Sequence, residues 1–453
     1  MVGGSLLFPG LVSQLLAEET TAAADDPLAP KATHFLPKAQ RVIFLYMSGG
    51  VSHVDSWDPK PKLFADDGKS IPVNEFQGRK GDFHMFLKRP QWGFWPRGQS
   101  GTEVSDLFPH LAECADHLCV IRSMKSDHTN HYEATLGIHT GSFTFARPSI
   151  GSWLSYGLGT VNRNLPSFVV IAPHSPYAGG QVWGSNFLPG AHQGTLVIPG
   201  AEPVANIQRR SPSSRLQELE LAAMNRMNQR HLAARPNDPL LTARIKSFET
   251  AFGMQAEMPE VFDLSKESDS TLAMYGLPRG STDGFAWQCL VARRLAERGV
   301  RFVELIDVGS SGNWDAHGDM LTHTPLAKNV DQPIAGLLKD LKQRGMLDDT
   351  LVVWTTEFGR TPFNAAPSAA GREHHHWVFS SWLAGAGVKP GMTFGESDEY
   401  GIDVARDAVH VHDFHATILH LMGLDHERLT FRHTGRDYRL TDVAGRVVNE
   451  ILA

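Results

Sequence analysis

The sequence contains no long apolar run, little cysteine and no excess of positive charge. No uninterrupted apolar stretch approaches the roughly 20 residues of a membrane-spanning helix, so we expect no transmembrane segment. The three cysteines, Cys114, Cys119 and Cys289, are too few for a disulfide framework and form no Cys-x-x-Cys pair, so we expect buried free thiols. The formal net charge of -7 argues against a nucleic-acid partner, because phosphate binding needs a concentrated basic surface.

The composition is that of a large globular protein. Apolar residues make up 42% and charged residues 20% of the 453-residue chain, which excludes a disordered or fibrous protein. A prior of about 150 residues per domain allows up to three domains, although a large α/β sheet holds the same length in one or two.

The first 40 residues differ in composition from the rest of the chain. Residues 3–17 are apolar and are followed by a stretch rich in small residues, which resembles the apolar region and cleavage site of an export signal. No basic residue precedes Lys31, so a truncated signal and a simple helical arm are the two interpretations, and we favour the signal. We therefore predict a signal remnant and linker over residues 1–40, one domain over 41–453, and export to the periplasm or cell exterior.

Buried-type strands alternate with helices along the rest of the chain. Near-continuous apolar runs, which are typical of strands buried on both faces of a parallel sheet, occupy residues 41–50, 119–124, 167–173, 301–307 and 350–360. Residues 106–118 and 333–347 have helical patterns, and residues 203–275 are expected to form a helical insertion. This order predicts a three-layer α/β sandwich with a mostly parallel central sheet.

Carboxylates and imidazoles follow several of these strands. Asp315 and His317 come after the strand at 301–307, Glu357 ends the run at 350–360, and a histidine triplet occupies residues 374–376. Because ligands of open α/β sheets gather at the carboxyl ends of the strands, we expect these groups to converge. A set of nitrogen and oxygen ligands favours Zn or Mn. The alternative for each residue taken alone is structural, because a single His or Asp in a loop is more often a helix cap or a surface group.

A second polar segment, residues 126–141, begins in a loop and continues into a helix. Its polar residues are expected near the helix N-terminus, where anions bind well. Thr129 and His131 are candidate nucleophiles, and His131 is also a candidate metal ligand or acid/base group. The alternative is structural, with Thr129 or Asn130 capping the helix.

The order of these segments resembles the alkaline phosphatase/sulfatase superfamily, and most closely the secreted family named domain of unknown function 1501. The resemblance covers about residues 40–450. The matching segments include DQPIAGLLKDLKQRGMLDDTLVVWTTEFGR, SSWLAGAGVKPGMTFG, VHVHDFHATILHLMGLD and DLFPHLAECADHLCVIRSM. The resemblance implies an alkaline-phosphatase-like fold.

Departures from the sulfatase pattern bear on the mechanism that the resemblance implies. His131 stands where sulfatases have the cysteine that becomes formylglycine, and no Cys-x-Pro-x-Arg motif occurs, so we expect a different mechanism. Residues 48–50 read Ser-Gly-Gly where sulfatases have paired metal-binding aspartates, and Asp55 and Asp58 from the following loop are the candidate substitutes. Glu357 occupies a metal-aspartate position, with Phe358 in place of the neighbouring histidine.

The resemblance therefore implies an exported, metal-dependent hydrolase of sulfate or phosphate esters, acting on a small-molecule or polysaccharide substrate. One or two divalent ions, Zn or Mn in preference to Ca, are expected on the following ligands: Asp315, His317, Glu357, His375, His376 and Asp55. Thr129 or a metal-bound water is the expected nucleophile, His131 the anion-binding or acid group, and Arg360 the group that neutralises developing charge. The alternative is a non-catalytic binding or assembly protein descended from the same fold.

Overall fold

The computed structural model describes residues 26–209, 211–235, 238–308 and 313–453. Residues 1–25 of the predicted signal remnant and linker (residues 1–40) lie outside the described residues, as do residues 309–312 of the loop before Asp315. The central sheet has the strand order β15-β6-β14-β10-β1-β9-β7-β8, with β18 beside β6. Its strands are β1 (Arg41–Met47), β6 (Leu118–Lys125), β7 (Phe168–Ile171), β8 (Thr195–Val197), β9 (Phe302–Asp307), β10 (Thr350–Thr355), β14 (Phe379–Ala384), β15 (Met392–Phe394) and β18 (Val409–His410).

Most neighbouring strands of this sheet are parallel. β1 pairs in parallel with both β9 and β10, so Val42 lies between Phe302 and Leu351. β7, β8 and β9 continue the parallel order, whereas β14 is antiparallel to β10 and β6. The predicted mixed α/β fold with a mostly parallel central sheet is therefore confirmed.

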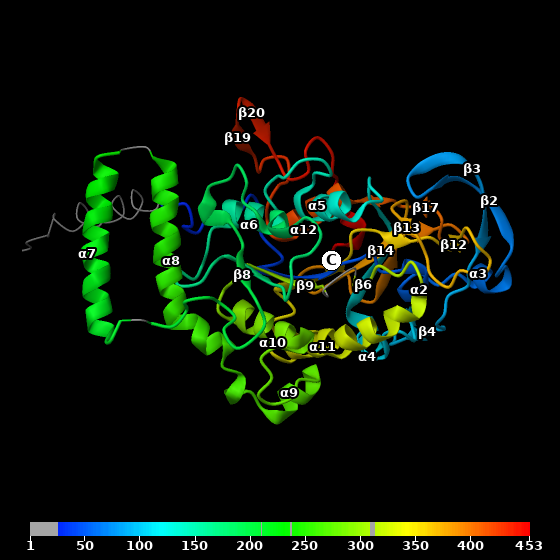
Figure 1. Cartoon of the computed structure of the whole chain (residues 1–453), viewed down its shortest axis with the longest axis horizontal. Coiled ribbons are helices and arrows are strands. Elements are labelled where there is room, and N and C mark those ends of the chain that lie inside the picture. Colours follow the sequence, from blue (N-terminus) through cyan, green and yellow to red (C-terminus); the bar gives the residue numbers. More distant parts are fainter. Residues whose placement is uncertain (1–25, 210, 236–237, 309–312) are drawn as a thin grey trace, which may run out of the picture.

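Helices cover both faces of the sheet (Figure 1). Val42, Phe44 and Tyr46 of β1 point to one face and pack in a core with three helices, α5 (His131–Thr140), α6 (Ile150–Leu158) and α12 (Val411–Leu421). Ile43 and Leu45 point to the other face and pack in a core with α4 (Pro109–Ala112), α10 (Gly284–Glu297) and α11 (His323–Gln343). Both faces of β1 are buried, which explains why its sequence is a continuous apolar run.

Two predicted helices differ from the observed ones. α11 begins at His323 rather than at residue 333, because Ala327 and Val330 extend the same buried stripe as Ile334, and Pro333 lies inside the helix. The helix predicted over 106–118 was wrong in length: α4 is a single turn, and the chain then tightens into a 3-10 turn at Ala115–His117. The three cysteines are buried and free, as predicted.

Smaller elements surround the sheet. The excursion at residues 60–104 forms two hairpins, β2 (Ser70–Phe76) with β3 (Arg79–Leu87) and β4 (Phe94–Arg97) with β5 (Thr102–Ser105). A helical hairpin of α7 (Ser214–Ala233) and α8 (Pro239–Phe262) projects at the left of Figure 1, and α9 (Asp269–Tyr275) follows it. The remaining elements are α2 (His53–Ser56), α3 (Pro61–Ala65), β11 (Gly359–Arg360), β12 (Phe363–Asn364), β13 (His374–His375), β16 (Glu396–Ser397), β17 (Val404–Arg406), β19 (Phe431–His433) and β20 (Arg436–Tyr438). Over the described ranges, no helix is both long and apolar enough to cross a membrane.

Candidate metal centre

Three adjacent strands and two further elements assemble a cluster of imidazoles and carboxylates. β10, β1 and β9 lie side by side, and Glu357 and Asp315 follow the carboxyl ends of β10 and β9. His131 is the first residue of α5, which begins there because the side chain of Asn130 accepts a hydrogen bond from the helix backbone. His374 lies in β13, which pairs with β11 just beyond Glu357. Of the two caps considered for this helix, Thr129 and Asn130, the structure shows Asn130.

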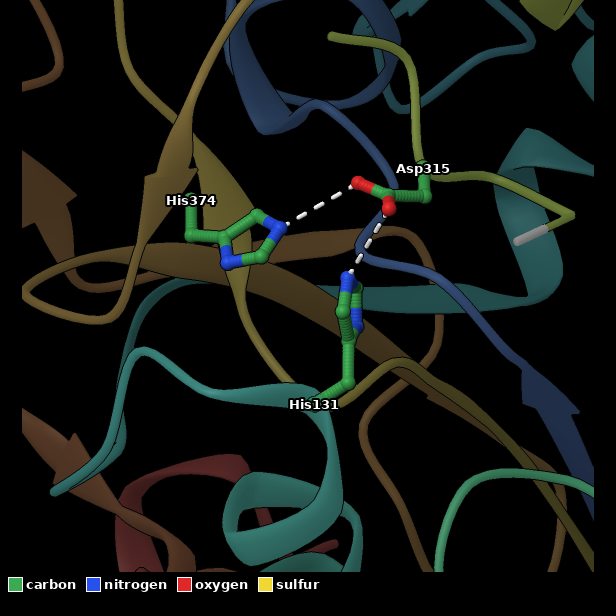
Figure 2. Close-up of side chains that lie close together, drawn as sticks. All are labelled: His131, Asp315 and His374. Atoms are coloured by element: carbon green, nitrogen blue, oxygen red, sulfur yellow. Dashed lines mark hydrogen bonds and ion pairs between the residues drawn. The ribbon is translucent and has the colours of Figure 1, made fainter. Parts of the chain in front are cut away.

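His131 is held between two carboxylates. Its Nδ1 donates to Glu357 Oε1 over 2.7 Å, and its Nε2 lies 3.3 Å from Asp315 Oδ2 (Figure 2). Glu357 is completely buried and also accepts from Tyr46 Oη at 2.9 Å and from the backbone N–H of Gly49 at 2.9 Å. Glu357 therefore fixes the position of the His131 ring and the nitrogen that bears its proton.

Two more histidines approach the same Asp315 carboxylate. His374 Nδ1 donates to the Thr129 carbonyl over 2.7 Å, and His317 Nδ1 donates to Glu373 over 2.7 Å. Their Nε2 atoms lie only 2.9 Å apart. The distance to Asp315 Oδ1 is 3.2 Å from His374 Nε2 and 2.9 Å from His317 Nε2.

The imidazole rings of His131, His374 and His317 share one tautomer. Each Nδ1 faces an oxygen that only accepts, so in a neutral ring the proton is on Nδ1 and the lone pair is on Nε2. His131 Nε2 is buried and, among the described residues, makes no hydrogen bond. His131, Asp315 and His374 each offer a ligand atom within 4.8 Å of the others. Electron-rich atoms that converge in this way fit a bound cation, and nitrogen together with oxygen ligands fits Zn or Mn.

Arg360 holds the Asp315 carboxylate of this cluster in place. Its fully buried guanidinium donates to Asp315 and to the carbonyls of Gly49, Gly50 and Arg372. Gly49 has φ of +116°, and a Cβ there would lie 2.5 Å from the backbone nitrogen of Trp314. The end of β1 thus approaches the Asp315 loop so closely that only glycine fits.

Electrostatics keep both carboxylates ionised. Burial raises the pKa of Asp315, but the neighbouring His131, His374 and Arg360 side chains hold it well below its usual range. Burial also raises the pKa of Glu357, yet its hydrogen bond with His131 lowers it overall. Burial lowers the pKa of His131, but the neighbouring carboxylates of Asp315 and Glu357 outweigh burial and raise it. Burial dominates at His374 and lowers its pKa.

Three of the expected ligands lie outside this group. Asp55 forms a buried ion pair with Arg372 at 2.7 Å. His375 Nε2 donates to the carbonyl of Ile402 over 2.6 Å. The ring of His376 packs beside its chain neighbour Trp377, with ring centroids 4.4 Å apart. The structure thus brings together Asp315, His317, Glu357, His131 and Arg360 from the expected set.

The sequence did not single out two residues of the cluster, His374 and Glu373, and it suggested a different role for Thr129. Within the triplet the geometry presents His374, because successive side chains of a strand point to opposite faces and His375 is turned away. Glu373, the residue before the triplet, orients His317. Thr129 contributes its carbonyl to His374, whereas its hydroxyl lies beside the turn between β2 and β3, 3.1 Å from where a Cβ of Gly78 would stand.

Fold and site together define a mixed α/β protein with a candidate divalent-metal centre at the carboxyl edge of its sheet. The chain belongs to the family described as protein of unknown function (DUF1501), whose model matches residues 39–452. No curated protein matches the sequence.

Several solved structures are similar to this chain at low identity. A phosphonate monoester hydrolase from Silicibacter pomeroyi is 11% identical, with 91% of this chain and 76% of that chain covered and a TM-score of 0.36. A sulfatase from Pseudoalteromonas sp. is 13% identical, with coverage of 85% and 68% and a TM-score of 0.35. An alkaline phosphatase from the Antarctic bacterium TAB5 is 13% identical, with coverage of 86% and 99% and a TM-score of 0.36.

Proposed function

We propose that the protein is a metal-dependent hydrolase of sulfate or phosphate esters. The observation that carries the proposal is the convergence of three histidine Nε2 atoms on the Asp315 carboxylate, each ring being held by an acceptor at Nδ1. His131, Asp315 and His374 would hold the cation, with His317 beside them. A divalent cation bound there supplies Lewis-acid polarisation of an ester oxygen.

The residues of this chain prepare the site in three ways. Glu357 keeps the proton on His131 Nδ1, and the Thr129 carbonyl does the same for His374. Arg360, which is itself fully buried, holds Asp315 in place through an ion pair. Because these contacts are already formed, the site needs little reorganisation when a ligand arrives. Of the two expected nucleophiles we favour water, because the Thr129 hydroxyl lies beside the turn between β2 and β3 and only its carbonyl faces the cluster.

Metal content tests the proposal. Protein purified without chelator should contain about one or two equivalents of Zn or Mn by inductively coupled plasma mass spectrometry. His374→Ala should lose most of that metal. His376→Ala is the matched control, because His376 belongs to the same triplet but lies outside the cluster. Wild-type protein that takes up no metal on reconstitution, or equal metal in both variants, would contradict the assignment.

One observation favours the alternative of a non-catalytic binding or assembly protein. The Arg360 guanidinium is engaged by Asp315 and by backbone carbonyls, so its donors are directed at the protein rather than at an anionic substrate. A screen of aryl sulfates, phosphate mono- and diesters and phosphonates with Zn or Mn separates the two functions. Turnover that is lost in His374→Ala excludes the non-catalytic function, and metal binding without turnover on any ester favours it.

We further propose that the protein is exported, on the basis of the apolar stretch at residues 3–17 and the small residues that follow. N-terminal sequencing of the protein recovered from the cell exterior or periplasm tests this. A mature start between residues 17 and 40 is expected, and recovery of the full chain only from the cytoplasm would contradict export.

A further inference from the structure

Tyr177 lies against the buried histidine of the metal centre, His131. The phenol ring stacks on the His131 imidazole, with ring centroids 4.2 Å apart and an angle of 8° between the planes. Phe358 packs near the same imidazole, with ring centroids 4.8 Å apart. Because the planes of Tyr177 and His131 are nearly parallel, the Tyr177 hydroxyl lies in a plane beside the imidazole instead of pointing away from it.

The turn that carries Tyr177 is held in place by the residues that follow it. Ala178 has a left-handed backbone, with φ of +66°. This conformation is unfavourable for a residue with a Cβ, and such residues cluster at binding sites. Beyond the turn, Val182 is completely buried, and Gln181 Nε2 donates to the Tyr132 hydroxyl over 2.6 Å. The Tyr177 ring is thus presented to the metal centre by an anchored segment.

The Tyr177 hydroxyl is a donor without an acceptor. It makes no hydrogen bond with the described parts of the chain, although the residue is half-buried. Burial and the Asp315 and Glu357 carboxylates raise the pKa of Tyr177 to about 12, so the hydroxyl keeps its proton at neutral pH. Asp315 contributes more than Glu357, although Glu357 is more deeply buried and buried charges act more strongly. The hydroxyl therefore lies toward Asp315, on the Nε2 side of His131 (Figure 2).

The other strong donors beside Asp315 are already used. The Arg360 guanidinium is engaged by Asp315 and by backbone carbonyls, and the Nδ1 atoms of the three histidines donate to fixed acceptors. A cation bound by the Nε2 atoms would attract an oxyanion, whose oxygens accept hydrogen bonds. A protonated phenol hydroxyl beside the cation site fits an oxygen of such an anion.

We infer that Tyr177 is an anion-contacting residue, whose hydroxyl donates a hydrogen bond to an oxygen of a phosphate or sulfate group at the metal centre. The inference rests on the proposed function, because this anion would be the ester group or the product of the reaction. The alternative is structural, with the Tyr177 ring only packing against His131. The anion contact depends on the hydroxyl and the structural role depends on the ring, so the two can be separated.

Phosphate binding by full-length protein that is loaded with zinc and freed of excess metal tests the contact. In isothermal titration calorimetry with inorganic phosphate, Tyr177→Phe should bind about ten-fold or more weakly than the wild type, because it loses a hydrogen bond to a charged group. The variant keeps the stacked ring, so its zinc content should equal that of the wild type. Parallel titrations with inorganic sulfate show which anion binds more tightly.

Tyr438→Phe is the matched control and should bind phosphate as the wild type does. Tyr438 is also half-buried, its hydroxyl makes no hydrogen bond to the residues that the structure describes, and its ring packs on Phe187, with centroids 4.9 Å apart. If Tyr177→Phe keeps the wild-type affinity for both anions and only Tyr177→Ala loses it, the ring is structural and the inference is overturned. A wild type that binds neither anion would also overturn it.

Ester turnover distinguishes a failure of this inference from a failure of the proposed function. Anion binding that depends on the Tyr177 hydroxyl, in a zinc-loaded protein that hydrolyses no ester, would support the contact and reject the hydrolase. Turnover that is lost in His374→Ala, together with unchanged anion binding in Tyr177→Phe, would support the hydrolase and reject the contact.

Discussion

Replacing Glu357 with Gln removes a charge from the metal centre while keeping its shape. The Gln oxygen in the Oε1 position can still accept from His131 Nδ1 and from the Gly49 N–H. Its amide nitrogen would face the hydroxyls of Tyr46 and Thr356, which can turn to accept. We therefore expect a folded protein whose His131 ring is still aligned but is a poorer metal ligand.

The magnitude follows from what Glu357 touches. Losing the group that orients a metal-binding histidine typically lowers metal affinity 10- to 100-fold, or about 1.4–2.7 kcal/mol. We expect Glu357→Gln at the lower end of this range. Glu357→Ala should reach the upper end and also destabilise the fold, because Gly49 N–H and Tyr46 Oη would be left without this buried acceptor. Each unsatisfied buried donor costs about 1–3 kcal/mol.

Competition with a chromogenic zinc chelator measures the affinity, and chemical denaturation of the metal-free proteins measures stability. Glu304→Gln is the matched control, since Glu304 is also a buried carboxylate paired with a histidine, His139, at 2.7 Å. That control should change stability but not metal affinity. Wild-type affinity in both Glu357 variants would refute the role of Glu357 in orienting His131.

Three further outcomes are expected. Gly49→Ala should lower both stability and metal affinity, because its Cβ would collide with the backbone before Asp315, whereas Gly318→Ala should change neither since a Cβ there meets nothing within 4 Å; metal titration and thermal melts check both. Burial lowers the pKa of His415 to about 3. Since an unfolded histidine titrates near 6.5, the stability from its neutral form is complete above about pH 6.5 and is lost toward pH 3, by up to about 1.4 kcal/mol per pH unit. Urea unfolding across this range should therefore show a shallower pH dependence for His415→Gln, but not for substitution of the exposed His231. Finally, a strong chelator should lower the melting temperature of the wild type and leave that of His374→Ala unchanged, because a ligand that binds only the folded state stabilises it.

The sequence predicted the strands of the sheet better than the helices around it. β1, β9 and β10 are buried on both faces, so their side chains form continuous apolar runs that stand out from the flanking polar residues. The start of α11 was missed because the helical pattern was taken to begin at Pro333, whereas Pro333 lies inside a helix that begins at His323. The single turn of α4 was over-extended because its apolar residues continue with helical spacing into a 3-10 turn.

Some of the site residues could be placed from the strand pattern alone, whereas others depend on tertiary contacts that the sequence does not reveal. Asp315 and Glu357 follow neighbouring parallel strands, so their approach to one another could be inferred from the strand pattern alone. Asp55 also follows a strand, but no local pattern indicates that Arg372 would neutralise it from a distant part of the chain. His374 rather than His375 belongs to the cluster because of the direction in which each side chain of β13 points. A strand of two residues is too short for a sequence period to reveal that direction.

The charge of the assembled cluster gives an independent reason to expect a cation. Asp315, Glu357 and Glu373 contribute three negative charges to the cluster, and Arg360, which pairs with Asp315, contributes one positive charge. If the imidazoles are neutral, the cluster therefore has a net charge of two negative units. Leaving two uncompensated charges at a partly buried site is costly, and proteins avoid it by binding a proton or a metal ion. Protonation of His131 would supply one positive charge, whereas a divalent cation supplies both and also satisfies the bare Nε2 atoms. The same groups that make the metal-free cluster unfavourable therefore make a divalent ion its natural occupant.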